Sequence, residues 1–151
     1  LVIGEGDLLP MYRQEYGHLG NLTFMPAVPQ ANLQGLLTCC DLLYFATPKT
    51  KTWNYGQSLN KLIDYMLSGT PVVGSYSGYP SMINEASSGS FVEAENPDAL
   101  RDEILRFKEL DAHTRKDMGE RGREWLLMHR TYRQLAEDYW RVLQPLFGSE
   151  L

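Results

Sequence analysis

Residues 55–73 read YGQSLNKLIDYMLSGTPVV, and this stretch decides the fold. Its first half has the pattern of a helix over residues 58–68, for which Ser58 is a suitable N-cap. Gly69 fits the position just past the end of that helix, where a left-handed residue is common. Residues 71–74 then start a strand. A helix that leads at once into a strand is half of the unit from which parallel sheets are built.

The residues around this stretch repeat the same alternation of strand and helix. Helical patterns fall at residues 8–19 and 32–40, and short apolar runs predict further strands over residues 1–4, 22–25, 41–46 and 91–92. These apolar runs are continuous rather than alternating, which is typical of strands covered on both faces. The sequence therefore predicts an α/β fold with a doubly wound parallel sheet.

The last third of the chain is helical in pattern. Asn96 is a suitable N-cap with Pro97 at the first helical position, and further helices are expected over residues 111–128 and from Thr131 onward. The last helix carries a stripe of apolar and aromatic side chains at helical spacing, namely Tyr132, Leu135, Tyr139, Val142 and Leu146. Packing in the core and between domains is the favoured interpretation of this stripe, and a ligand-stacking surface is the alternative.

Composition and charge exclude several classes of function. The 151 residues carry a net charge of −5, which argues against a nucleic-acid partner. No apolar stretch approaches the roughly 20 residues of a membrane helix, so a cytoplasmic protein is expected. The adjacent Cys39 and Cys40 are expected to be buried, reduced thiols. Neither they nor the three scattered histidines have the spacing of metal ligands.

Basic side chains are rare in the first 100 residues and gather in one place. Three of the four in that part of the chain, Lys49, Lys51 and Lys61, fall within thirteen residues. Such a local positive spot suits a small anion rather than a polyanion.

Ligands of open parallel sheets bind beyond the carboxyl ends of the strands, so the loops there are candidate sites. The loop at residues 4–7 has a Gly-x-Gly turn, but Leu9 stands where a dinucleotide fingerprint has its third glycine. This turn either lets a ligand approach the backbone or is only a tight turn with Asp7 as a helix cap. The loop at residues 74–80, before a helix around residues 82–85, is either a second close approach or a flexible connection.

The remaining loop, residues 47–57, runs into the helix that starts near Ser58, whose first amides favour an anion. Lys61 lies in that first turn, where a cation costs about 0.3–1 kcal/mol and a ligand phosphate would compensate it. Asp64 follows three residues later on the same helix face. A surface ion pair between Lys61 and Asp64 is the alternative, and the spacing does not decide between the two.

The run at residues 55–73 resembles the donor-binding signature of the retaining glycosyltransferases of family four, which have the GT-B fold. It is most similar to the bacterial branch that makes surface polysaccharides, where Asn-Lys-Leu precedes an acidic residue, Tyr-Met and Gly-x-Pro-Val. The surrounding pieces occur in the family's order: the Gly-x-Gly turn, residues 21–24, Val28, Asp41, residues 96–100 and residues 118–123. The resemblance covers nearly the whole chain.

This resemblance implies that residues 1–151 form a Rossmann-like, nucleotide-sugar-binding C-terminal domain that ends in helices. The family's first strand and helix, with a Gly-Arg and Lys-Gly phosphate-binding segment, would lie before Leu1. The N-terminal acceptor domain would lie before them. The chain is therefore expected to lack both.

The resemblance also implies roles for particular residues. The backbone around Ser58, Leu59 and Asn60 would hold the donor diphosphate, with Lys61 as counter-charge. Asp64 stands where the family usually has a glutamate that accepts hydrogen bonds from the ribose.

Other positions would lie near the donor sugar or base. Gly4, Gly6 and Val28 would border the nucleotide. Gly56 replaces a glutamate that touches the donor sugar in many relatives. That contact would then come from Lys49, Lys51 or Asn54.

The expected donor is a UDP-sugar or GDP-sugar, with UDP favoured, and the transferred group is a hexosyl or N-acetylhexosaminyl unit. Amides, a helix dipole and a lysine can stabilise the departing diphosphate, so no metal and no cofactor are expected. The resemblance implies a lipid-linked acceptor at the inner membrane, in polysaccharide or glycolipid biosynthesis. The fragment alone is expected to be inactive.

Three other functions remain open at this stage: a non-catalytic nucleotide-binding module, a sugar epimerase with the same donor site, and a fragment of a dinucleotide-dependent oxidoreductase. The last is disfavoured because the third glycine is missing and no ribose-binding acid follows about twenty residues later.

Overall fold

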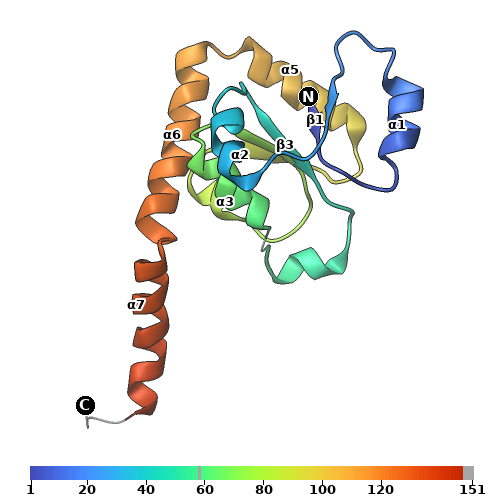
Figure 1. The fold of residues 1–151 in the computed structure, drawn as a ribbon. Coiled ribbons are helices and arrows are strands. Elements are labelled where there is room, and N and C mark those ends of the chain that lie inside the picture. Colours follow the sequence, from blue (N-terminus) through green and yellow to red (C-terminus); the bar gives the residue numbers. More distant parts are fainter. Residues whose placement is uncertain (58, 148–151) are drawn as a thin grey trace. The chain divides into compact units, whose positions relative to one another are not determined.

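A computed structural model of the chain describes residues 1–57 and 59–147, so Ser58 and residues 148–151 lie outside the described residues (Figure 1). The chain divides into two compact units, Leu1–Leu36 and Leu37–Leu151. Parallel strands with helices between them confirm the predicted α/β class.

The first unit contains a small parallel sheet. Strand β1 (Val2–Ile3) pairs with β2 (Phe24–Met25), and helix α1 (Leu9–Tyr16) connects them. Each element lies inside its predicted range but is shorter. Hydrogen bonds from the Val2 amide to the Thr23 carbonyl and from the Gly4 amide to the Met25 carbonyl extend the pairing.

Helix α2 (Gln30–Leu37) begins and ends earlier than the predicted range of residues 32–40. The two cysteines therefore lie in the turn that follows it rather than on a helix. Cys39 is exposed and Cys40 is half-buried, so the prediction of two buried thiols is wrong, although both are free of a disulfide.

The second unit is built on a three-stranded parallel sheet in the order β3 (Leu43–Ala46), β4 (Val72–Ser75), β5 (Gly89–Val92) (Figure 1). The register aligns Leu43 with Val72 and Val72 with Gly89. Strand β4, the central strand, is buried along its whole length, and helix α5 (Pro97–Glu109) packs against it. Strand β3 is at the edge and alternates buried with exposed residues, so the expectation of coverage on both faces does not hold for it.

Helices surround this sheet, and their bounds agree with the sequence patterns to within a few residues. Helix α5 packs against β4 and β5, whereas α6 packs against α3 and α4. The elements are η1 (Lys51–Tyr55), α3 (Asn60–Leu67), α4 (Met82–Glu85), α5 (Pro97–Glu109), α6 (Ala112–His129), α7 (Tyr132–Leu143) and η2 (Gln144–Leu146).

Side-chain caps fix where the last three long helices begin. As predicted, the Asn96 side chain accepts a hydrogen bond from the Ala99 amide at 3.0 Å, and Pro97 opens α5. Asp111 and Thr131 cap α6 and α7 in the same way. Each such cap stabilises a helix by about 1 kcal/mol.

Two glycines let α6 lie close to its neighbours, Gly119 at the turn between α3 and β4 and Gly122 at Ser88 just before β5. A Cβ at Gly119 would stand 1.8 Å from the Gly69 carbonyl oxygen, and one at Gly122 would stand 2.7 Å from Ser88 Cβ. Beneath this contact lies the core, in which Leu62, Met66 and Phe107 are at most 1% exposed. Gly69 itself has φ +69°, as expected for the residue past the end of α3.

The stripe on α7 is exposed rather than buried. Tyr132 is 94% exposed and Tyr139 is 67% exposed, and Val142 and Leu146 are exposed as well. Figure 1 shows why: α7 runs on from the end of α6 and away from the three-stranded sheet. Packing of the stripe in the core of this chain is therefore not observed, and its packing against another domain stays a prediction.

Among the described residues, no helix has both the length and the apolar character needed to cross a bilayer.

Candidate functional site

Two loops meet at the carboxyl edge of the three-stranded sheet, which is the edge where β3, β4 and β5 end. The loop after β3 contains η1, and the loop after β4 contains Tyr76, whose side chain is 4% exposed. The Tyr76 hydroxyl lies 2.9 Å from the Tyr79 carbonyl oxygen and 3.3 Å from that of Trp53, and the Tyr79 amide also donates to Trp53. These hydrogen bonds tie the loop at residues 74–80 to the end of η1, as a close approach of the two loops requires.

Helix α3 opens at this edge, and no side-chain cap is found for it among the residues that the structure describes. It begins at Asn60, and the cap position belongs to Leu59, which has an extended backbone and no side-chain cap hydrogen bond. The predicted cap, Ser58, lies outside the described residues, and the helix begins two residues later than predicted. Because a leucine cannot accept hydrogen bonds through its side chain, the first amides of α3 are not satisfied by their own cap residue.

A cavity of about 410 Å³ lies at the start of α3. Three walls surround it: the first turn of α3, the start of α4, and the junction between α6 and α7. The lining residues are Gln57, Leu59, Asn60, Ile63, Met82, Arg130, Tyr132 and Leu135. We call this space the α3 cavity.

Gln57 has hydrogen-bonding capacity that the described protein does not use. Both side-chain polar atoms, Oε1 and Nε2, are buried and have no hydrogen-bond partner. A buried amide of this kind costs about 1–3 kcal/mol relative to a paired one. The residue before it, Gly56, has φ +131° and ψ 172°, a conformation that essentially only glycine adopts.

A second cavity at the same edge, of about 490 Å³, lies where β3 and β4 meet the start of α5. Thr47 lines it and is 7% exposed, and its hydroxyl has no hydrogen-bond partner. Glu95 lines it as well and has φ +64°, which is uncommon for a residue other than glycine.

Lys49 is already engaged at this edge. Its Nζ lies 2.6 Å from Oε1 of Glu93, and its backbone amide donates to Glu95 at 3.0 Å. The hydrogen bond and charge of Lys49 hold the pKa of Glu93 below its ordinary value, and Glu93 raises the pKa of Lys49. To touch a sugar, Lys49 would first have to leave this pair.

Some of the other predicted site residues line the α3 cavity and some do not. Leu59 and Asn60 line it. Lys61 is exposed and Asp64 is half-buried, and neither is among its lining residues. Lys51 and Asn54 are exposed on η1.

Gly4, Gly6 and Val28 belong to the first unit. There Gly4 has φ +138°, so the first turn of the chain needs a glycine.

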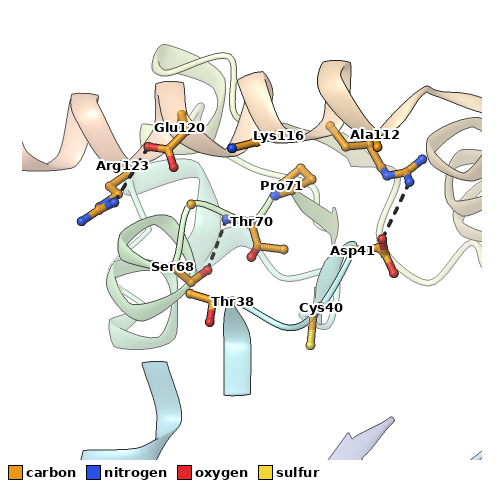
Figure 2. Close-up of a pocket in the computed structure, with 12 residues that line it drawn as sticks. Thr38, Cys40, Asp41, Ser68, Thr70, Pro71, Ala112, Lys116, Glu120 and Arg123 are labelled. Atoms are coloured by element: carbon orange, nitrogen blue, oxygen red, sulfur yellow. Dashed lines mark hydrogen bonds and ion pairs between the residues drawn. The ribbon is translucent and has the colours of Figure 1, made fainter. Parts of the chain in front are cut away.

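The opposite, amino edge of the sheet has a cavity of about 370 Å³, shown in Figure 2. Its polar groups are largely paired: Thr70 Oγ1 donates to the Leu37 carbonyl, and the Thr70 amide donates to Ser68 Oγ. Arg115 donates to the Leu110 carbonyl and lies 3.7 Å from Asp41, and Arg123 lies 4.0 Å from Glu120. The Arg115–Asp41 pair joins α6 to the segment just before β3, and the other contacts engage the remaining polar groups within the protein.

Cys40 also lines the cavity at the amino edge, and burial raises the pKa of its thiol. A raised pKa keeps the thiol protonated at neutral pH and lowers its reactivity. Among the residues that the structure describes, no three His, Cys, Asp or Glu side chains gather in a way that could hold a metal ion.

The α3 cavity contains two residues that the sequence did not single out, Gln57 and Arg130. Gln57 lies inside the signature stretch, but nothing in the stretch indicates that its amide is buried without a partner. Arg130 lies 70 residues after Asn60, and only the fold brings the junction of α6 and α7 to the start of α3.

Comparison with known proteins gives two results. Residues 1–109 match the family described as glycosyl transferases group 1. The chain is also similar in structure to the sucrose-phosphate synthase (tll1590) of Thermosynechococcus elongatus, with a TM-score of 0.68 and 20% sequence identity. That match covers 95% of this chain and 34% of the synthase chain, so the chain spans about a third of the synthase's length. No curated protein sequence is similar enough to count as a match.

Proposed function

The chain belongs to the glycosyl transferases of group 1, and from this premise we propose that it binds the donor of a sugar-transfer reaction. The donor is a nucleoside diphosphate sugar, with UDP as the expected nucleotide. The observation that carries the proposal is the start of α3, where the described cap residue Leu59 supplies no side-chain cap and a cavity lies at the carboxyl edge of the parallel sheet. Ligands of this class of fold bind at that edge.

The start of α3 suits a diphosphate for physical reasons. Unsatisfied amides and the positive end of a helix dipole attract anions, and Leu59 and Asn60 lie at the cavity wall. We propose that the backbone at residues 58–60 contacts the diphosphate. Lys61 would add positive charge near it and Asp64 would accept hydrogen bonds from the ribose.

The donor sugar would lie near η1. Lys49 is paired with Glu93, so we assign the sugar contact to Lys51 and Asn54, which are exposed on η1. Gly56 has no side chain to offer. For Gly4, Gly6 and Val28 of the first unit, the role beside the nucleotide stays a prediction.

Transfer of a sugar builds negative charge on the departing diphosphate, and preorganised donors stabilise that charge in the transition state. We propose that the amides at the start of α3 and the nearby cations do this without a metal ion. The acceptor would be held by another domain. A lipid-linked acceptor in polysaccharide or glycolipid synthesis belongs to the same proposal.

Calorimetric titration of the chain tests the donor proposal. We expect binding of UDP or GDP and no binding of NAD. Lys61→Ala should weaken nucleoside diphosphate binding, whereas Lys116→Ala on the exposed surface of α6 is the matched control and should not. Binding of NAD without binding of UDP or GDP would overturn the proposal in favour of a dinucleotide-dependent protein.

A further inference from the structure

The α3 cavity has one cation on its wall, and it is not the one that the signature stretch supplies. Arg130 follows α6 as its C-cap residue, and its amide donates to the Leu126 carbonyl at 2.8 Å. Its guanidinium carbon lies 5.7 Å from the centre of the Trp125 ring. Lys61, by contrast, is not among the residues that line the cavity.

Arg130 also differs from the other arginines of the second unit. Six of them, Arg101, Arg106, Arg115, Arg123, Arg133 and Arg141, lie within ion-pair distance of a carboxylate. Arg121 donates to the Ser87 carbonyl. Within the described part of the chain, no carboxylate or carbonyl partner is found for the Arg130 guanidinium, so its N–H groups keep their hydrogen-bonding capacity for a ligand.

Gln57 adds a second unused group to the same cavity. Its carboxamide offers two N–H donors and a carbonyl acceptor, and neither polar atom has a partner in the protein. Nearly all buried polar groups in native proteins are paired, so the Gln57 amide at the wall of this cavity is a group that a bound ligand could satisfy.

We propose that Arg130 and Gln57 bind the diphosphate of the donor, together with the start of α3. A guanidinium presents a planar fork of donors that fits two phosphate oxygens, and a primary amide donates a neutral hydrogen bond to a third. The dipole of α3 points its positive end at the same space, so all three groups favour an anion. This inference rests on the proposed function and adds two side chains, one of them far away in sequence.

The test compares a nucleotide with its nucleoside. UDP and uridine, and likewise GDP and guanosine, are titrated into the chain and its variants by calorimetry. Arg130→Gln should weaken binding of the diphosphate by about tenfold or more and leave nucleoside binding unchanged, because only the diphosphate lies near the guanidinium. Arg130→Lys keeps the charge but not the fork and should lose less. Gln57→Leu should weaken diphosphate binding by a smaller factor.

Arg133→Gln is the matched control, because Arg133 lies three residues further on and pairs with Glu137 at 3.0 Å. Arg133→Gln should change neither the affinity for the nucleoside diphosphate nor that for the nucleoside. Circular dichroism and thermal unfolding check that each variant keeps its fold.

The outcomes separate the two proposals. If the chain binds UDP or GDP and Arg130→Gln does not weaken that binding, the inference is wrong and the proposed function stands. An equal loss for nucleotide and nucleoside would also overturn it, because Arg130 would then act on the base or on the fold. If the chain binds no nucleoside diphosphate at all, the proposed function fails and the inference fails with it.

Discussion

The amino and carboxyl edges of the three-stranded sheet differ in how completely their polar groups are paired. At the amino edge Thr70 donates to a backbone carbonyl and Arg115 reaches both a carbonyl and Asp41. At the carboxyl edge Thr47 and Gln57 are buried without partners. Both edges have cavities of similar size, so volume alone does not distinguish them. The two edges are therefore distinguished by buried polar groups without hydrogen-bond partners, which a ligand could satisfy, and not by cavity volume.

The largest expected effect comes from opening the packed amino edge. Gly119→Ala would place a methyl group 1.8 Å from the Gly69 carbonyl oxygen, so α6 must move. We expect the free energy of unfolding to fall by about 3 kcal/mol, the upper end of the usual cost of overpacking. Denaturation in urea measures this. Gly35→Ala on α2 is the control, because nothing lies within 4 Å of its Cβ position; a similar loss there would contradict the packing explanation.

A smaller loss is expected from the strained backbone at the carboxyl edge. Gly56→Glu would place a side chain at φ +131°, which costs about 1–3 kcal/mol for a residue other than glycine. We therefore expect lower stability and no gain in sugar binding, measured by thermal unfolding and by titration with a UDP-sugar. Gly20→Glu, at an open position without positive φ, should change stability little. Stronger donor binding by Gly56→Glu would show that the backbone can adapt.

Two buried threonines compare the edges directly. Thr70→Val removes a hydrogen bond of 3.0 Å and leaves the Leu37 carbonyl without it, so stability should fall by about 1 kcal/mol. Thr47→Val removes a hydroxyl that has no partner, so stability should stay the same or rise by a similar amount. Urea denaturation of the two variants side by side gives the comparison. A loss of equal size at both sites would mean that Thr47 is paired in solution.

The smallest expected effect concerns the surface pair between Lys49 and Glu93. The pair lowers the pKa of Glu93 from its ordinary value of 4.5 and raises that of Lys49 from 10.5. Its contribution is therefore complete between these two ordinary values. It is lost as the pH falls through the pKa of folded Glu93, or rises through that of folded Lys49.

Lys49→Met should return the pKa of Glu93 toward 4.5, as seen by NMR titration, with almost no change in stability because the pair is exposed. Lys51→Met is the control and should leave the pKa of Glu93 where it is.

Sequence patterns predicted the helices and strands of this fold better than they predicted which faces of those elements are buried. Asn96, Gly69 and the order of strands and helices follow from local rules of capping and periodicity, and the structure confirms them. The exposure of β3 and of the stripe on α7 could not be predicted, because an apolar pattern does not say which neighbours are present.

The candidate site was predicted only in part, for a related reason. Leu59 and Asn60 line the α3 cavity. Their place there could be predicted, because the start of a helix follows from the local sequence. Arg130 comes from a junction 70 residues away, and the unpaired state of Gln57 depends on three-dimensional packing. Ser58, the expected cap, lies outside the described residues, and the role of Lys61 still depends on the binding experiments.

The backbone at Gly56 has a consequence for how this site could change over generations. Glycine and glutamate codons can differ by one base, so a mutation of Gly56 to glutamate is easy to reach in the gene. The conformation at φ +131° makes the same step difficult for the protein, because the loop would have to refold before a side chain could be accommodated. If the proposed sugar contacts are right, a lineage with this loop is more free to vary Lys51 and Asn54 than to acquire a glutamate at position 56, and changes in sugar preference are expected to appear first in η1.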